Sequence, residues 1–252
     1  LAGGGVLAIT ALAGPVWQKL EQPLFRQESS LVILLDLSRS MDAADTKPSR
    51  LARAKLKVKD ILERRHEGET ALIVYAGSAF VVTPLTSDSH TIASQLSGLS
   101  TDMMPVRGSR TDLALEKGMA LLRQSDRISG ALLVVSDGIE GAPEQLMEVQ
   151  VKQLSESGYR LLLLGAGSSE GAPIPLPSGG FVKDDEGNIV LAAQDTAQMQ
   201  RAARLGGGIF RQLAADESDI NALLSLVDVE RTVDETQAVE GMVSDQWQEE
   251  GP

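Results

Sequence analysis

Three oxygen-bearing side chains follow one apolar run of the sequence. Residues 31–35 read Leu-Val-Ile-Leu-Leu, Asp36 comes next, and Ser38 and Ser40 lie two and four positions beyond it. Alternate side chains of an extended loop point the same way, so the three groups can converge on one point. Carboxylate and hydroxyl oxygens suit a hard divalent cation, with Mg²⁺ the expected ion and Mn²⁺ or Ca²⁺ the alternatives.

Two other segments offer oxygen ligands of the same kind. Asp137 follows a second apolar run, 131–135, and Ser109 and Thr111 lie between the two motifs where a helix is expected to begin. A centre with few direct carboxylates leaves the metal electrophilic, so a protein partner could complete it with an acidic side chain. The predicted metal site therefore consists of Asp36, Ser38, Ser40, Asp137 and a hydroxyl from Ser109 or Thr111. No residue is predicted to be catalytic.

The elements that position these residues indicate an α/β fold. Apolar runs alternate with helical segments, which predicts a doubly wound, mainly parallel sheet with helices on both faces. Ligands of such sheets bind beyond the carboxyl ends of the strands, where Asp36 and Asp137 lie. Strands are expected at 31–35, 71–75, 79–83, 131–135, 159–164 and 209–213, with 79–83 antiparallel to 71–75. Helices are expected from about 48 to 62 and at 87–99, 110–124, 143–157, 195–205 and 217–229.

Two local features complete the expected fold. Gly179-Gly180 and the stretch 185–188 are turn sequences with apolar pairs between them, which predicts a β-hairpin insertion over 173–191. The helix that begins at Pro48 has an apolar stripe, and its basic residues are expected to be solvated surface. Those basic residues are Arg50, Arg53, Lys55, Lys57 and Lys59.

Composition excludes several classes of function. The 252 residues carry a formal net charge of −12, which disfavours nucleic-acid binding because phosphate backbones are repelled. The chain has no cysteine, so disulfides, thiol catalysis and cysteine-based zinc sites are excluded. Its two histidines, His66 and His90, are too few for a multi-histidine centre and are expected at the surface. Hydrophobic residues make up 42%, enough for a substantial core.

The first residues have the character of a membrane segment. Residues 1–17 carry no charge, end in Trp17 and are followed by Lys19. This stretch is slightly shorter than the about 20 residues that span a bilayer, so it is interpreted as the distal part of a transmembrane helix with an interfacial tryptophan. Residues 18–30 are interpreted as a polar connector to the folded domain.

The motif Asp36-x-Ser38-x-Ser40, the later Ser136-Asp137-Gly138 and the order of elements resemble the von Willebrand factor A domain. The resemblance implies one such domain over 31–231, with a metal-ion-dependent adhesion site that carries the DxSxS signature. Ser38 and Ser40 would then ligate the metal directly, whereas Asp36 and Asp137 would act mostly through water and by charge. In that family a threonine lies five residues before a small-apolar pair. Counting back from Ala114-Leu115 reaches Ser109, a departure that keeps Thr111 as the alternative ligand or a helix cap.

Five further stretches of the sequence are distinctive: Gly14-Pro15-Val16-Trp17, Pro48-Ser49-Arg50-Leu51, Ala79–Thr86, Met104–Ser109 and Trp247–Pro252. They are similar to the bacterial aerotolerance (Bat) membrane proteins. That similarity implies a domain held between two membrane helices at the inner membrane and facing the periplasm, with the polar tail 232–252 leading to the second helix. It also implies related von Willebrand factor A proteins and a MoxR-type AAA+ ATPase as partners.

The favoured function is a metal-dependent protein-binding module rather than an enzyme. One alternative is a phosphoryl-transfer enzyme with Asp36 as the nucleophile, although such a site would want an acidic residue where Ser38 stands. A second alternative is a structural domain whose metal site is degenerate. The glycine-rich stretch 165–171 lacks the spacing and the following helix of a dinucleotide site, and is expected to be a plain loop.

Overall fold

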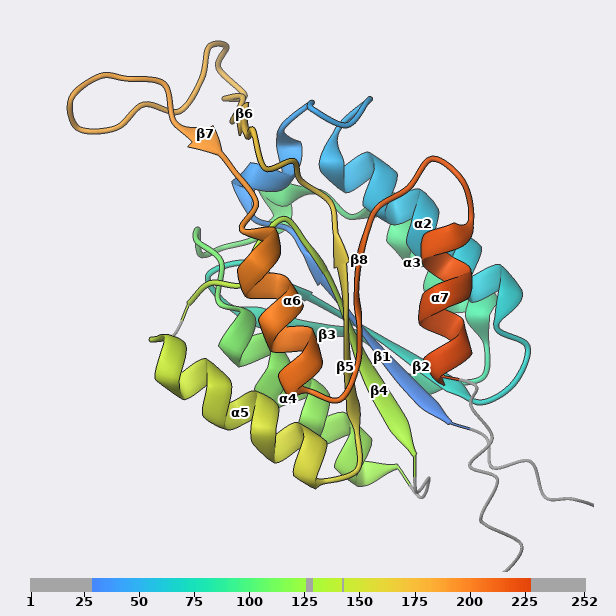
Figure 1. Cartoon of the computed structure of the whole chain (residues 1–252). Helices are drawn as coiled ribbons and strands as arrows, with labels where there is room; N and C mark the ends of the chain where they lie inside the picture. The colour runs from blue at the N-terminus through green and yellow to red at the C-terminus, as the bar shows by residue number, and fades with distance from the viewer. Residues whose placement is uncertain (1–28, 126–128, 142, 228–252) are drawn as a thin grey trace, which may run out of the picture. The chain divides into compact units, whose positions relative to one another are not determined.

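The computed structural model describes residues 29–125, 129–141 and 143–227 (Figure 1). These residues fall within one compact unit. The membrane helix predicted at 1–17, nearly all of the connector at 18–30 and the tail at 232–252 lie outside the described residues. Within the described ranges, no helix has the length and apolar character needed to cross a membrane.

A six-stranded sheet forms the centre of the fold, in the order β3-β2-β1-β4-β5-β8. β3 runs antiparallel to β2, and every other neighbouring pair is parallel. All seven residues of β1 and of β4 are buried, as expected for parallel strands that helices cover on both faces. The strands are β1 (Ser30–Asp36), β2 (Glu69–Tyr75), β3 (Ala79–Thr86), β4 (Gly130–Ser136), β5 (Arg160–Gly165) and β8 (Phe210–Gln212).

Helices pack on both faces of this sheet, so the predicted doubly wound α/β fold is confirmed (Figure 1). The side chains of α2, α3 and α7 join one apolar core, and those of α4, α5 and α6 join the core on the opposite face. The helices are α2 (Arg50–Arg64), α3 (Ser89–Gly98), α4 (Thr111–Gln124), α5 (Glu144–Glu156), α6 (Thr196–Leu205) and α7 (Ser218–Val227). Two short 3₁₀ turns, η1 (Arg39–Asp42) and η2 (Thr101–Met103), lie in the loops.

The predicted insertion is a hairpin between β5 and α6. Its base is β6 (Ala172–Pro173) paired antiparallel with β7 (Leu191–Ala192). Further bridges join Pro175 to Phe181 and Lys183 to Ile189. In Figure 1 the insertion extends away from the sheet, beyond the helices.

Two of the basic residues of α2 are not at the surface, which corrects the prediction. Arg50 is 0% exposed and Lys57 is 5% exposed. Each is buried with a carboxylate partner, because Arg50 pairs with Asp45 and Asp137 and Lys57 pairs with Asp219. Burying a charge is costly unless it is paired, so these ion pairs are what permits the burial. The prediction holds for Lys59, which is well exposed, whereas Arg53 and Lys55 are half-buried.

Candidate metal centre

The predicted site residues meet at the carboxyl edge of the two central strands. β1 and β4 are parallel neighbours, with Leu35 paired to Val135, so both strands end at the same level. Asp36 is the last residue of β1, and Asp137 follows the last residue of β4. Asp36 is 0% exposed, and the Asp137 side chain is nearly buried. Two carboxylates are therefore held in the protein interior side by side at the sheet edge.

The loop after β1 connects these two carboxylates through hydrogen bonds. The backbone N–H of Ser38 donates to Asp36 Oδ1 at 2.7 Å. The hydroxyl oxygens of Ser38 and Ser40 lie 3.0 Å apart, and Ser40 Oγ donates to Asp137 Oδ1 at 3.0 Å. The spacing of two residues thus brings both hydroxyls to the same place as the two carboxylates, as the sequence motif predicts.

A third loop, residues 104–110 between η2 and α4, brings Ser109 to the other side of Asp36. Ser109 Oγ lies 3.4 Å from Asp36 Oδ2, to which it donates. The loop is held against the end of β2, since Arg110 N donates to Ala76 O at 2.7 Å and Gly77 N donates to Val106 O at 3.0 Å. Ser109 is therefore the third-loop hydroxyl that touches the first loop's carboxylate.

Thr111 lies close by, and its hydroxyl accepts a hydrogen bond from the loop after β4. It is the first residue of α4 and is buried, and its Oγ1 accepts from Glu140 N at 3.4 Å. Its own N–H donates to Glu140 O at 3.0 Å, so Thr111 joins α4 to the loop that carries Asp137. The contacts favour Ser109 over Thr111 as the ligand from this loop, and metal ligation by any of these residues stays a prediction.

The electrostatics of the site differ between its two carboxylates. Burial and the charge of Asp137 raise the pKa of Asp36 from 3.8 to about 7, and hydrogen bonds from Ser136 and Ser38 only partly oppose this shift. Asp137 has Arg50 as an ion-pair partner. In the described part of the chain, no basic side chain forms an ion pair with Asp36. Asp36 is thus a buried carboxylate without a basic partner among the described residues.

The donor set fits a divalent cation of the hard class. Tyr75, which pairs with Asp36 across β1 and β2, has a buried phenolic oxygen that makes no hydrogen bond of good geometry with any described residue. Burial and the charge of Asp36 raise the pKa of Tyr75 well above its usual value. A hydrated cation would neutralise Asp36, and its water could satisfy an orphaned polar atom of this kind.

The hydroxyls are indispensable to this interpretation. The described residues contain no group of three or more His, Cys, Asp or Glu side chains that could hold a metal by themselves. His66 and His90 are both exposed, as predicted, and contribute nothing here. A metal at this edge would therefore need serine oxygens among its ligands.

Three neighbours of the centre were missed by the sequence analysis. Ser136 Oγ donates to Asp36 Oδ2 at 2.6 Å, and its signal was a hydroxyl at the end of a buried strand. Tyr75 ends the strand beside β1 and was treated only as an apolar strand residue. Arg50 occupies the first turn of α2, where the helix dipole disfavours a cation. That misplaced charge was a signal that Arg50 has a specific acidic partner.

A small hollow opens beside the centre. It has a volume of about 60 Å³ and is lined by Ser38, Arg39, Thr101, Val106 and Gly108, among others. Arg39 pairs there with Asp102 and Asp42. The candidate metal edge, formed by the carboxyl ends of β1 and β4 with the loops that carry Ser38, Ser109 and Asp137, is therefore concave on the side of the third loop. The hollow leaves room for a group that approaches Ser38.

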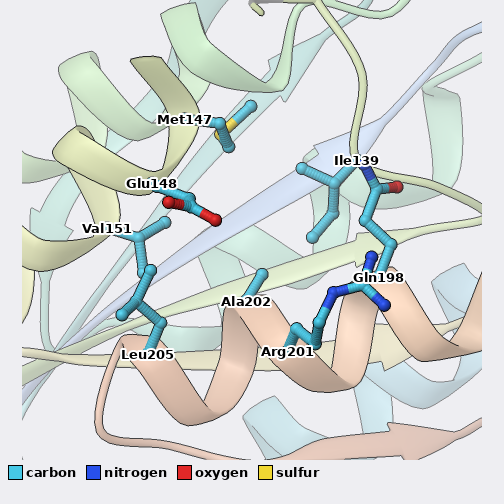
Figure 2. A pocket seen from close by; sticks show the side chains of 8 residues that line it. All are labelled: Ile139, Met147, Glu148, Val151, Gln198, Arg201, Ala202 and Leu205. Atoms are coloured by element: carbon cyan, nitrogen blue, oxygen red, sulfur yellow. The ribbon is translucent and has the colours of Figure 1, made fainter. Parts of the chain in front are cut away.

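A larger hollow of about 220 Å³ lies between α5 and α6 (Figure 2). Ile139, Met147, Val151, Ala202 and Leu205 make most of its wall apolar. Its charged side chains are Glu148 from α5 and Arg201 from α6. This pocket offers none of the hydroxyl groups that the metal edge presents, although Ile139 belongs to the loop after Asp137.

Comparison with known proteins identifies a domain and two similar crystal structures. Residues 31–140 match the family profile of the von Willebrand factor type A domain. An aerotolerance-related membrane protein from Bacteroides fragilis is 28% identical with a TM-score of 0.75, and the match covers 79% of this chain and 98% of that one. The conserved hypothetical protein BatB from Bacteroides thetaiotaomicron is 29% identical with a TM-score of 0.71, over 77% of this chain and 94% of that one.

Two further proteins are less similar to this chain. An uncharacterised protein from Borreliella burgdorferi is 24% identical over 216 residues, and the match covers 84% of this chain but only 62% of that protein. The chain thus spans less than two thirds of this curated relative. Proximal thread matrix protein 1 of the mussel byssus, solved with zinc in its metal-ion-dependent adhesion site, is 14% identical with a TM-score of 0.56. It shares the fold over 81% of this chain and 46% of its own.

Proposed function

We propose that this chain is a metal-dependent protein-binding module of a bacterial envelope protein. The premise is that it carries a von Willebrand factor type A domain. The resemblance drawn from the DxSxS motif and from the longer stretches is confirmed by the family profile and by the two Bacteroides structures. The metal, the partner and the membrane attachment are the parts that we propose.

The observation that carries the proposal is the buried Asp36 carboxylate among hydroxyl groups. Its pKa of about 7 reflects burial and the repulsion by Asp137. A divalent cation at this edge would relieve both effects, because it would compensate the buried charge and separate the two carboxylates. Hydrogen bonds to Ser136, Ser38 and Ser109 orient Asp36 without neutralising it.

Each residue has a defined task in this proposal. Ser38, Ser40 and Ser109 would hold the cation through their hydroxyl oxygens, and Asp36 and Asp137 would act by charge and through water. The bound metal supplies a Lewis-acidic position that a carboxylate from a protein partner can occupy. Mg²⁺ is the ion that we expect, since the donors are oxygen atoms only.

The arrangement does not support an aspartate-based phosphoryl-transfer enzyme. Asp36 accepts hydrogen bonds on both oxygens, from Ser38 N on Oδ1 and from Ser136 Oγ on Oδ2. The position two residues later is Ser38 rather than an acid that could protonate a leaving group. Arg50, a buried cation beside Asp137, is engaged by two carboxylates. We therefore propose a binding module rather than an enzyme.

The wider setting follows from the Bat-like neighbours. One of them is a membrane protein by its description. We propose that the uncharged residues 1–17 anchor this chain in the inner membrane, with the domain in the periplasm. A MoxR-type AAA+ ATPase and related von Willebrand factor A proteins are the partners proposed for the whole assembly.

Metal binding can be tested by titrating Mg²⁺ and Mn²⁺ into chelator-treated protein and following heat and melting temperature. Saturation to 100 times Kd should stabilise the wild type by about 2.7 kcal/mol. Asp36→Asn and Ser38→Ala should abolish or strongly weaken the response. The matched control is Ser94→Ala, whose hydroxyl bonds only within its own helix, to Thr91 O at 2.8 Å. A wild type that shows neither heat nor stabilisation would instead support a degenerate site.

Partner binding needs a separate experiment. Immobilised protein should retain an envelope partner in Mg²⁺ and release it in chelator, and Ser40→Ala should fail to retain it. Acidic residues of that partner can then be replaced one at a time. Retention that is insensitive to both the chelator and Ser40→Ala would show that the metal is not what binds the partner.

A further inference from the structure

We infer that Arg50 is a positioning residue of the metal centre with two tasks. Arg50 neutralises Asp137, so that a bound metal stays electrophilic, and Arg50 also fastens the base of the hairpin insertion beside the centre. This inference rests on the proposed function. It concerns how strongly the centre attracts a metal, and it is argued from Arg50, which lies outside the DxSxS motif. The main observation is that the Arg50 guanidinium is fully buried and joins three separate segments, those of Asp45, Asp137 and Ala192.

The contacts of Arg50 use the whole guanidinium group. Nε and Nη2 form a bidentate pair with Asp45, at 2.8 Å to Oδ1 and 2.7 Å to Oδ2. Nη1 donates to Asp137 Oδ2. Nη2 also donates to Ala192 O, at the end of β7, at 2.7 Å. The planar donor fork of arginine suits such a junction, whereas the single ammonium of lysine cannot reproduce it.

The junction is fixed in place by the loop after β5. A Cβ atom on Gly167 would lie 3.0 Å from Asp137 Cβ and 3.1 Å from Arg50 Cζ, so the bare backbone packs directly over the ion pair. The next residue, Ser168, donates to Asp45 Oδ2 from its N–H at 3.0 Å and from its hydroxyl at 2.7 Å. Asp45 is held as an anion, because hydrogen bonds from Arg50 and Ser168 outweigh its burial and lower its pKa to about 2.

The consequence for the metal follows from how the two oxygens of Asp137 are used. Oδ1 accepts from Ser40, a predicted metal ligand, and Oδ2 accepts from Arg50. A carboxylate that shares its charge with a guanidinium attracts the cation less strongly, so the metal retains affinity for a carboxylate from outside. Asp36 forms no ion pair with a basic side chain among the described residues, so it would supply the main attraction.

The hairpin is coupled to the same residue. Ala192 closes the base of the insertion through its pairing with Ala172. Arg50 therefore contacts the metal edge and the hairpin base with neighbouring nitrogens of one side chain. Such a link sets where the insertion starts relative to Asp137, and it places the insertion next to any partner that reaches the metal.

The test measures Mg²⁺ affinity by calorimetry on the full chain, with hydrogen exchange of residues 188–194 as the second readout. Arg50→Gln should lower the Kd for Mg²⁺ roughly tenfold, because Asp137 regains its full charge. Arg50→Lys should leave the Kd within about threefold of wild type, since it keeps the charge. Both variants should speed exchange at 188–194, because each loses the bond to Ala192. Asp45→Asn should raise the Kd, because Arg50 then acts on Asp137 alone.

A purely structural role for Arg50 predicts a different pattern, in which every variant weakens Mg²⁺ binding. Arg50→Gln that folds, by near-ultraviolet circular dichroism, and binds Mg²⁺ no more tightly than wild type overturns the inference. If Arg50→Gln does not fold, Arg50→Lys decides, and a Kd raised well beyond threefold over wild type overturns the inference. Arg53→Gln, on the same helix without a side-chain ion pair among those described, is the control and should change neither readout. A wild type that binds no Mg²⁺ refutes the proposed function itself, which distinguishes the two failures.

Discussion

The buried ion pair between α2 and α7 gives the sharpest stability prediction. Lys57 Nζ lies 2.8 Å from Asp219 Oδ1, and the two side chains are 6% and 1% exposed. Lys57 also donates to Asp216 O, while Asp219 accepts from Ala214 N at 2.9 Å and Ile220 N at 2.8 Å. The pair therefore joins the middle of α2 to the first turn of the last described helix.

Replacing Lys57 with methionine should be strongly destabilising. It leaves a buried carboxylate without its cation, and removing one partner of a buried pair costs about 3–5 kcal/mol. The two backbone N–H donors to Asp219 remain, so we expect the lower end of this range, about 3 kcal/mol. For a protein of this size, 1 kcal/mol corresponds to about 2–4 °C in Tm, so the melting temperature should fall by about 6–12 °C.

The control makes the same substitution on the same helix. Lys59 pairs with Glu63 at 3.5 Å, and these side chains are 57% and 61% exposed. Exposed pairs contribute about 0–1 kcal/mol, so Lys59→Met should be nearly neutral in urea unfolding. The double variant Lys57→Met/Asp219→Asn should recover part of the loss, because no buried charge remains. A Lys57→Met variant that matches Lys59→Met in its free energy of unfolding would refute the reasoning.

Three further predictions follow from single positions. In chelator, the folded protein keeps a proton on Asp36 up to about pH 7, whereas the unfolded chain releases that proton near pH 3.8. The free energy of unfolding should therefore fall by about 4 kcal/mol as pH rises from 3.8 to about 7. Urea titrations should show this slope, and Asp36→Asn should remove it. Gly77→Ala should weaken Mg²⁺ binding measured by calorimetry, because its Cβ would lie 2.3 Å from Arg107 O and must displace the loop that carries Ser109. Leu133→Ala, at 1% exposure in the core, should lower the free energy of unfolding by about 2–5 kcal/mol in urea.

The fold was predictable because its strands are almost uninterrupted apolar runs. The stretch Leu31–Leu35 has no polar residue, and the structure buries it on both faces. The antiparallel placement of β3 followed from chain length alone, since three residues separate it from β2 and cannot form a crossover helix. The final strand was less well defined, and it shortened from the predicted 209–213 to Phe210–Gln212, with only three residue pairs joining it to β5.

The proximity of Asp36 and Asp137 was predictable for a related reason. Parallel strands end at one edge, so the positions of Asp36 and Asp137 after two apolar runs implied that they meet. What the sequence could not supply was the choice between Ser109 and Thr111. That choice depends on how the third loop is held by Ala76 and Gly77, two residues that lie more than 30 positions away along the chain.

Arg50 and Lys57 of α2 were predicted at the surface but are buried, and they show what hydrophobic periodicity cannot predict. The apolar stripe of a helix identifies the face that packs on the sheet, but α2 is also flanked by α7, whose residues lie about 160 positions later. Lys57 is buried by that second contact, and Arg50 is buried by segments that come 87 and 142 residues after it. A hydrophobic pattern read along one helix contains no information about either neighbour.

The same long-range contacts account for the asymmetry between the two carboxylates of the candidate metal centre. Asp36 and Asp137 end adjacent parallel strands and look equivalent in the sequence, yet only Asp137 has a guanidinium against it. The difference arises because α2 begins at the carboxyl edge of the sheet and turns its first residue towards Asp137. Under the proposed function, Asp36 would thus be left to attract a cation, while the charge of Asp137 is compensated by Arg50. A cation held mainly by one uncompensated carboxylate and by neutral hydroxyls keeps the charge that a partner's acidic side chain requires.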